Sequence, residues 1–166
     1  DDLNLDGEYL KNADKIYIIA CGSSYHVGMV AKYVLEKLLR KPVEVTLASE
    51  FRYCDPLVSE RTLCIVISQS GETIDTLAAM REAKRLGARI LSIVNVVGSS
   101  IARESDDVLY TWAGPEIAVA TTKAYSTQLA VIYLIALRFA ELLGTIGEEE
   151  YENIVAEILT IPTKME

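Results

Sequence analysis

Cysteine and histidine are scarce in this chain of 166 residues, which contains three cysteines and one histidine. Cys21, Cys54 and Cys64 are odd in number and form no CxxC pair, so neither a disulfide framework nor a redox motif is indicated. One histidine with scattered cysteines also lacks the ligand spacing of a zinc site. We therefore expect no metal, no other cofactor, and a reduced, cytoplasmic location.

Long apolar runs are missing as well. The longest run, residues 129–137, is too short to cross a bilayer and is followed by Arg138. Residues 1–10 carry four acids and no base, which is unlike a secretory signal. The sequence therefore predicts neither a membrane span nor a signal peptide.

Basic side chains number 16 against 24 acidic ones, which gives a net charge of −8. This balance disfavours nucleic acid and anionic membrane surfaces as partners. The acidity is concentrated at the ends: residues 1–10 carry −4, residues 148–166 carry −5, and residues 11–147 are left at +1. The composition therefore does not exclude a small phosphate, which backbone N–H groups can hold.

Apolar residues make up 51% of the chain and the mean hydropathy is +0.23, which indicates a folded domain of ordinary size. Short apolar runs alternate with segments of helical periodicity. The expected strands are residues 15–20, 43–47, 62–67, 88–94 and 108–112. The expected helices are residues 25–40, 73–86, 121–143 and 148–160, with one helical turn at 49–52. This alternation predicts a three-layer α/β fold, doubly wound and flavodoxin-like, with a five-stranded parallel sheet of order 2-1-3-4-5.

The two ends of the chain favour a division into three segments. The chain does not begin with Met, and it stops shortly after Pro162. We expect an acidic lead over residues 1–14, one folded domain over residues 15–145, and a helical linker over residues 146–166. This pattern is typical of a domain excised from a longer protein.

Two loops follow the first and third expected strands, where such sheets bind their ligands. The loops, residues 21–25 and 68–73, combine hydroxyl side chains with glycine and a helix N-terminus, which together suit an anion. The alternative is that Ser70 or Thr73 only caps the following helix. Glu72 argues against an anion site unless its carboxylate points away. No GxxxxGK[ST] or GxGxxG motif is present, so a nucleotide is the less favoured ligand.

A third segment, residues 118–123, places small residues, hydroxyls and Lys123 before the longest expected helix. It suits either a ligand contact or an ordinary threonine cap. Ser99 and Ser100 are expected to cap a helix. His26 has no evident carboxylate partner, so we interpret it as a partly buried helix residue without a catalytic role.

Five motifs occur in a characteristic order: CGSSYH (residues 21–26), ASEFRY (48–53), SQSGET (68–73), NVVGSS (95–100) and ATTKA (120–124). Over roughly residues 15–145 they resemble the glucosamine-6-phosphate synthase family, the isomerising glutamine:fructose-6-phosphate amidotransferases. Family members have a glutaminase domain followed by two sugar isomerase (SIS) domains, and this chain is similar to the first SIS domain. The resemblance implies a role in amino sugar biosynthesis, a sugar phosphate ligand and a homodimer.

The resemblance also assigns site residues. The family loop that binds the phosphate group of fructose 6-phosphate or glucosamine 6-phosphate matches Ser68, Gln69, Ser70 and Thr73. Positions that contact the sugar match Ser24, Val119 and Ala120, with Thr121 beside them. Further substrate-binding candidates are Gly22, Ser23 and Lys123. The family usually has Thr at position 23 and Ser at position 121, and both replacements keep a hydroxyl group.

The family's catalytic groups have no match in this chain. Its isomerase glutamate, ring-opening histidine and sugar-contacting lysine lie in the second SIS domain or beyond, and its cysteine nucleophile lies in the glutaminase domain. We therefore expect a phosphosugar-binding half that is inactive alone. Two alternatives stay open: a stand-alone regulatory module that senses a sugar phosphate, and a complete isomerase with Glu50, Glu72 or Glu116 as its base.

Overall fold

A parallel sheet of five strands forms the centre of the computed structural model, which describes residues 5–117 and 121–165. The strands are β1 (Lys15–Ala20), β2 (Val43–Leu47), β3 (Thr62–Ser68), β4 (Arg89–Val94) and β5 (Asp107–Tyr110). Their order is β2-β1-β3-β4-β5, and every neighbouring pair is parallel, as the sequence predicts. The direction of winding reverses between β1 and β3, so the carboxyl ends of these two strands mark the switch point of the sheet.

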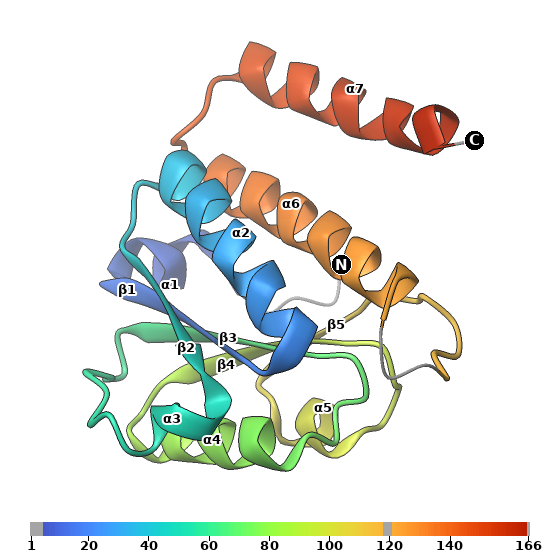
Figure 1. Cartoon of the computed structure of the whole chain (residues 1–166). Helices are drawn as coiled ribbons and strands as arrows, with labels where there is room; N and C mark the ends of the chain where they lie inside the picture. Colours follow the sequence, from blue (N-terminus) through green and yellow to red (C-terminus); the bar gives the residue numbers. More distant parts are fainter. Residues whose placement is uncertain (1–4, 118–120, 166) are drawn as a thin grey trace.

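Helices cover both faces of the sheet and complete three layers (Figure 1). On one face lie α2 (Gly22–Leu39) and α6 (Lys123–Leu143). On the other lie α3 (Ala48–Phe51), α4 (Ile74–Arg85) and α5 (Ser100–Glu104). Side chains alternate along each strand, so Ile18 packs into the α2 and α6 layer while Ile19 packs into the opposite layer.

The interval expected as an acidic lead, residues 1–14, contains the helix α1 (Gly7–Asn12). Asp6 caps this helix by accepting a hydrogen bond of 2.7 Å from the backbone N–H of Tyr9. Leu10 is only 1% exposed and belongs to the core on the α6 side. This part of the lead therefore packs into the domain, which corrects the expected division. A six-residue helix is too short to show a helical period in the sequence.

Helix boundaries also differ from the expectation at the carboxyl ends of the strands. Helix α2 begins at Gly22, three residues earlier than predicted, and α6 begins at Lys123, two residues later. Ser99 and Ser100, expected as a cap, do begin a helix, the five-residue α5. The sequence pattern did not reveal α5 itself because five residues make little more than one turn.

By length and composition alone, α6 is apolar enough to cross a membrane. Its apolar residues are needed inside the fold, however, because Ile132, Ile135 and Phe139 are each no more than 3% exposed. These side chains pack with α2 and the sheet in one continuous cluster. Burial in the core therefore explains the apolar residues on the inner side of this helix.

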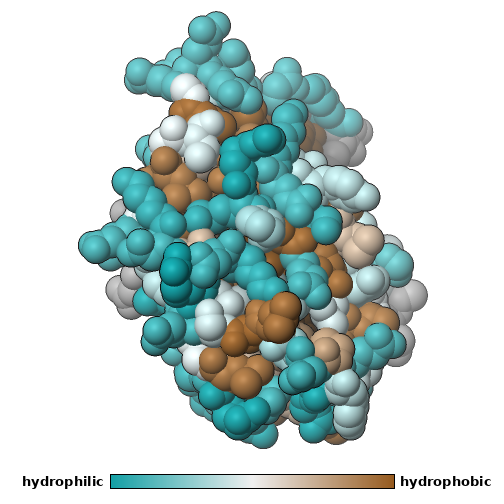
Figure 2. Space-filling model, turned by 90° about the vertical axis from the view of Figure 1, so that its left-hand side faces the viewer, coloured by the Kyte–Doolittle hydropathy of each residue, from teal (hydrophilic) through white to brown (hydrophobic). Residues whose placement is uncertain are grey.

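The last helix, α7 (Glu148–Met165), lies outside the three layers, beyond α2 and α6 (Figure 1). Tyr151, Ile154 and Ile158 are half-buried and pack against the cluster on the α6 side, whereas Leu159 is 73% exposed. Figure 2 shows hydrophobic side chains in separate patches among hydrophilic ones on the side of the molecule that it views. The helix runs past its expected end at residue 160 and includes Pro162.

Candidate functional site

A cavity of about 420 Å³ opens at the carboxyl ends of β1 and β3, the position expected for a ligand. It is lined by Cys21, Gly22, Ser23, Ser24, Ile67, Ser68, Gln69, Ser70, Thr73, Thr76, Glu116 and Thr121. The structure thus brings the loops at residues 21–25 and 68–73 together, although they are more than forty residues apart in the sequence. Among these lining residues, Glu116 is the one with a carboxylate or a basic group.

Two helices begin at this cavity without a side chain capping their first turn. The N-cap residues are Cys21 for α2 and Thr73 for α4, and neither makes a side-chain cap hydrogen bond. The first-turn N–H groups of both helices therefore lack an intrahelical partner and carry the positive end of the helix dipole. Two such ends converging on one cavity are suited to an anion.

Hydroxyl groups hold the loop at residues 68–73 in shape. The Gly71 N–H donates to Ser68 Oγ at 3.1 Å, and the hydroxyls of Ser68 and Thr73 are 3.1 Å apart and share one hydrogen bond. The Glu72 N–H donates to Ser70 Oγ at 3.2 Å. Ser70 thus closes a turn within the loop and does not cap α4. A hydroxyl that accepts one of these bonds keeps its own proton to donate to a ligand.

The Glu72 carboxylate points away from the cavity. Its Oε1 accepts a hydrogen bond of 2.7 Å from the backbone N–H of Ser100, at the start of α5. Hydrogen bonding from Ser100, with a smaller contribution from Arg103, holds the pKa of Glu72 below its usual value. The carboxylate is thus bonded to the start of α5 and does not line the cavity.

Ser24 links α2 to α6 beneath the cavity. Its hydroxyl donates to Gln128 Oε1 at 3.1 Å, and both residues are buried. Gln128 was not predicted from the sequence. The available signal was a single amide on the helix face that otherwise buries Ala124, Ile132 and Ile135.

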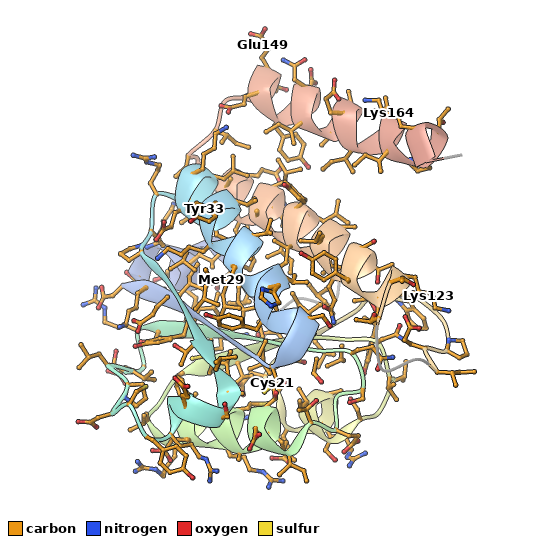
Figure 3. All side chains as sticks on the ribbon, viewed as in Figure 1. Cys21, Met29, Tyr33, Lys123, Glu149 and Lys164 are labelled. Atoms are coloured by element: carbon orange, nitrogen blue, oxygen red, sulfur yellow. The ribbon has the colours of Figure 1, made fainter. Side chains whose placement is uncertain are left out.

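The third candidate segment is only partly brought to the cavity. Thr121 lines it and donates to Glu116 Oε2 at 3.3 Å, while Val119 and Ala120 lie outside the described residues. Lys123 is exposed at the start of α6, does not line the cavity, and is labelled in Figure 3. The structure therefore gives no support to Lys123 as a ligand contact.

Only one of the three candidate bases lies at the cavity. Glu116 lines it, and its Oε2 also accepts a 3.4 Å hydrogen bond from the Ala124 N–H in the first turn of α6. Glu50 lies on α3 and Glu72 on the loop from β3 to α4, and both are exposed and absent from the lining. Of these carboxylates, Glu116 alone can reach a ligand here.

His26 and Cys21 do not form a catalytic pair. His26 is exposed near the start of α2, so the expectation of partial burial is wrong, and its ring packs edge-to-face with that of Tyr25, with 5.7 Å between the ring centroids. Cys21 lines the cavity and accepts a long contact of 3.7 Å from Thr76 Oγ1. Over the described ranges, His, Cys, Asp and Glu side chains form no cluster that could hold a metal ion.

Asn95, just after β4, connects the loops around the cavity. Its N–H donates to Gln69 O at 3.1 Å, and its side-chain Oδ1 accepts from Thr111 Oγ1 at 3.0 Å and from the Ala113 N–H at 2.8 Å. Its side-chain amide donates to Gly114 O at 2.8 Å. One asparagine thus fixes the loop after β3 relative to the segment after β5.

A doubly wound sheet with a cavity at its switch point is characteristic of α/β domains that bind ligands at the carboxyl ends of their strands. Within that class, the model of the SIS domain family matches residues 9–138, and the chain belongs to this family.

Particular relatives are closely similar. The chain is 60% identical over its whole length to a glutamine–fructose-6-phosphate aminotransferase (isomerizing) of Clostridium acetobutylicum and 49% identical to that of Streptomyces coelicolor. It spans about a quarter of the length of these relatives, 27% in each.

Solved structures of related proteins have the same fold as this chain. The C-terminal domain of glucosamine-fructose-6-phosphate aminotransferase from Francisella tularensis superposes with a TM-score of 0.89 at 41% identity, over 93% of this chain and 44% of that one. A glucosamine-6-phosphate deaminase from Thermotoga maritima superposes with a TM-score of 0.74 at 25% identity, over 90% of this chain and 48% of that one.

Proposed function

We propose that this domain binds the phosphate group of a six-carbon sugar phosphate, fructose 6-phosphate or glucosamine 6-phosphate. The observation that carries the proposal is the convergence of two uncapped helix N-termini and a hydroxyl-rich loop on one cavity. Its volume of about 420 Å³ is within the range of small-molecule sites.

In this proposal the two ends of the ligand meet different parts of the cavity. Ser68, Gln69, Ser70 and Thr73 hold the phosphate together with the first N–H groups of α4. The loop at residues 22–24 and Thr121 provide hydrogen bonds to the sugar hydroxyls. Val119 and Ala120 belong to the sugar contacts through the family resemblance alone.

The proposed parent protein is an isomerising glutamine–fructose-6-phosphate aminotransferase, in which this domain is one half of the isomerase. The parent moves an amino group from glutamine to fructose 6-phosphate and converts the ketose to an aldose. Proton transfer between C1 and C2 needs a positioned general base. We expect the separate domain to bind the sugar phosphate without catalysing this step.

Calorimetry with the separate domain tests the proposal. Fructose 6-phosphate is expected to give measurable heat, and fructose none, because the phosphate supplies most of the recognition. Replacing both Ser68 and Ser70 by alanine should weaken binding at least about tenfold, since hydrogen bonds to a charged group contribute about 1.5–3 kcal/mol each. Ser126→Ala, on the exposed side of α6, is the matched control. Absence of heat with the wild-type domain rejects the proposal.

A second candidate, a complete isomerase, is favoured by the place of Glu116 in the cavity lining. An isomerase assay on the separate domain and on Glu116→Gln decides between the two. Turnover that disappears in the variant would support the isomerase, whereas binding without turnover supports the binding half.

A homodimer and a cytoplasmic location complete the proposal. The three free cysteines suit a reducing compartment. The exposed side chains of Tyr133 and Leu134 give α6 an apolar outer side that suits pairing. Light scattering that finds only monomer at high concentration would reject the dimer for this domain.

A further inference from the structure

Glu72 is the one acidic residue within the proposed phosphate-binding loop, residues 68–73. A carboxylate a few ångströms from a phosphate would weaken binding through Coulomb repulsion. The loop must therefore use this charge elsewhere if it binds an anion.

The Glu72 carboxylate binds the start of α5. The N-cap residue of this helix, Ser99, makes no side-chain cap hydrogen bond of its own. Glu72 Oε1 takes that place by accepting from the Ser100 N–H at 2.7 Å. A carboxylate at a helix N-terminus is attracted by the unpaired N–H groups and the helix dipole.

The start of α5 also forms a hydrogen bond with Gly71, the residue before Glu72. The Ile101 N–H donates to Gly71 O at 3.0 Å. Gly71 has φ +66°, and a Cβ at this position would collide with the side chain of Ser99. Gly71 and Glu72 therefore lie directly against α5, through two hydrogen bonds and one close backbone approach.

These contacts continue into the cavity. The Gly71 N–H donates to Ser68 Oγ, and Ser68 shares a hydrogen bond with Thr73, the N-cap residue of α4. A fixed position for residues 71 and 72 therefore fixes both cavity hydroxyls and the start of α4.

We propose that Glu72 is a positioning residue for phosphate binding: by capping α5 it holds the loop so that the hydroxyls and the α4 N-terminus face the cavity. Glu72 does not touch the ligand. This inference rests on the proposed function, because it concerns how the same loop recognises a phosphate.

The test compares three variants of the domain. Glu72→Ala removes the acceptor, Glu72→Gln keeps an acceptor oxygen without the charge, and Glu82→Gln, on α4 and away from the cavity, is the control for net charge. Dissociation constants for fructose 6-phosphate and inorganic phosphate are measured by calorimetry at 10 °C. Hydrogen exchange of the Ser100 and Ile101 amides is followed without ligand.

Glu72→Ala is expected to bind both ligands about tenfold more weakly, with faster exchange at Ser100 and Ile101. Glu72→Gln should lie within about threefold of the wild type, because its amide oxygen can still accept from Ser100. Glu82→Gln should match the wild type in both measurements. Thermal unfolding of all three variants is measured to show that each is folded at 10 °C, so a change in the dissociation constant reports on binding and not on a general loss of stability.

Equal or tighter binding by folded Glu72→Ala would overturn the inference, since the carboxylate would then contribute nothing or only repulsion. Should Glu72→Ala not fold, a Glu72→Gln variant that loses binding while remaining folded would overturn it equally. If the wild type binds neither ligand, the proposed function fails and the inference fails with it. If the wild type binds and the variants do not differ, the inference alone fails.

Discussion

The two ends of the parallel sheet are built from opposite chemistry. At the amino end, ion pairs join Arg89 to Asp107 at 2.8 Å and Lys84 to Asp106 at 2.9 Å. At the carboxyl end, the cavity is lined almost entirely by neutral hydroxyl, amide and thiol groups. Ion pairs therefore stabilise the amino end of the sheet, and the cavity lies at the opposite end. The other end keeps two helix dipoles uncapped, which lowers stability locally and leaves them available to an anion.

At the amino end, Arg89 contacts both a buried carboxylate and an aromatic ring. The side chain of Asp107 is fully buried, and Arg89 also lies over the ring of Tyr9, 5.3 Å from its centroid. The hydrogen bond from Arg89 to Asp107 raises the pKa of the arginine above its already high value. Through its contact with Tyr9, Arg89 also connects the sheet to α1, the helix that the sequence did not predict.

Arg89→Met should have the largest effect on stability. Removing one partner of a pair with a buried carboxylate is expected to lower the free energy of unfolding by about 3 kcal/mol. The affinity of the folded variant for a sugar phosphate should not change, because the cavity is at the other end. Urea denaturation and calorimetry measure the two quantities.

Arg61→Met is the control for this variant. Arg61 pairs with Asp14 at 2.6 Å, but both side chains are more than half exposed. The expected cost is under about 1 kcal/mol, as for other exposed pairs. If Arg89→Met changed affinity as much as stability, the two ends would not be independent.

Gly71→Ala should have the second largest effect on stability and should abolish ligand binding. The substitution places a Cβ at φ +66° and against the Ser99 side chain, at an expected cost of about 2 kcal/mol. Gly144→Ala is a matched control, because Gly144 has the same φ of +66° with no atom within 4 Å of its Cβ position. The difference between the two variants, measured by thermal unfolding, gives the cost of the collision. Equal costs would mean that α5 yields to the new methyl group.

Cys64 lies inside β3, between the two ends of the sheet, and its thiol should make the stability of the fold depend on alkaline pH. Burial raises the pKa of its thiol to about 12, against an ordinary value of 9.0. Between these values the unfolded thiol loses its proton and the folded one keeps it, so the free energy of unfolding falls as pH rises above 9.0. The expected loss is about 1 kcal/mol at pH 10.

Urea denaturation between pH 8 and pH 10.5 measures this slope in the wild type and in Cys64→Ala. Burial also raises the pKa of Tyr9 and of Tyr17, and both contribute with the same sign. The variant should therefore keep a smaller slope. An unchanged slope would show that the thiol titrates alike in both states.

Ser92→Ala should have the smallest effect and the opposite sign. Ser92 lies inside β4, is fully buried, and its hydroxyl has no hydrogen-bond partner among the described residues. Removing an unpaired buried hydroxyl is expected to raise the free energy of unfolding by about 0.5–1 kcal/mol. Thermal unfolding measures the change, and a clear loss of stability would indicate a buried water on this hydroxyl.

The sequence predicted those features that depend on neighbouring residues or on a regular period. The apolar runs of β1 and β3, the strand order and the positions of the two hydroxyl loops follow from local pattern and the general rules for parallel sheets. The helix α1 was not expected, and α5 was indicated only by its serine cap, because such short helices leave little periodic signal. The partial burial of His26 was predicted wrongly, because its position on α2 faces away from the side that buries Ser24 and Val27.

Contacts between distant segments were beyond local pattern. The direction of the Glu72 side chain depends on Ser100, which is 28 residues further along. The role of Gln128 depends on Ser24, and the role of Asn95 on Gly114. The binding role of the cavity residues themselves stays a prediction that the ligand measurements above will test.

The hydrogen bond between Ser24 and Gln128 has a consequence for how the protein is made. It joins residues 104 positions apart, and a second bond, from Thr145 Oγ1 to Leu38 O, joins residues 107 positions apart. Closing such long loops is entropically costly and slows folding. During synthesis the loops after β1 and β3 emerge well before α6 exists to pack behind them. We therefore expect the cavity, and with it the proposed binding, to form only once α6 has been synthesised and has packed against α2.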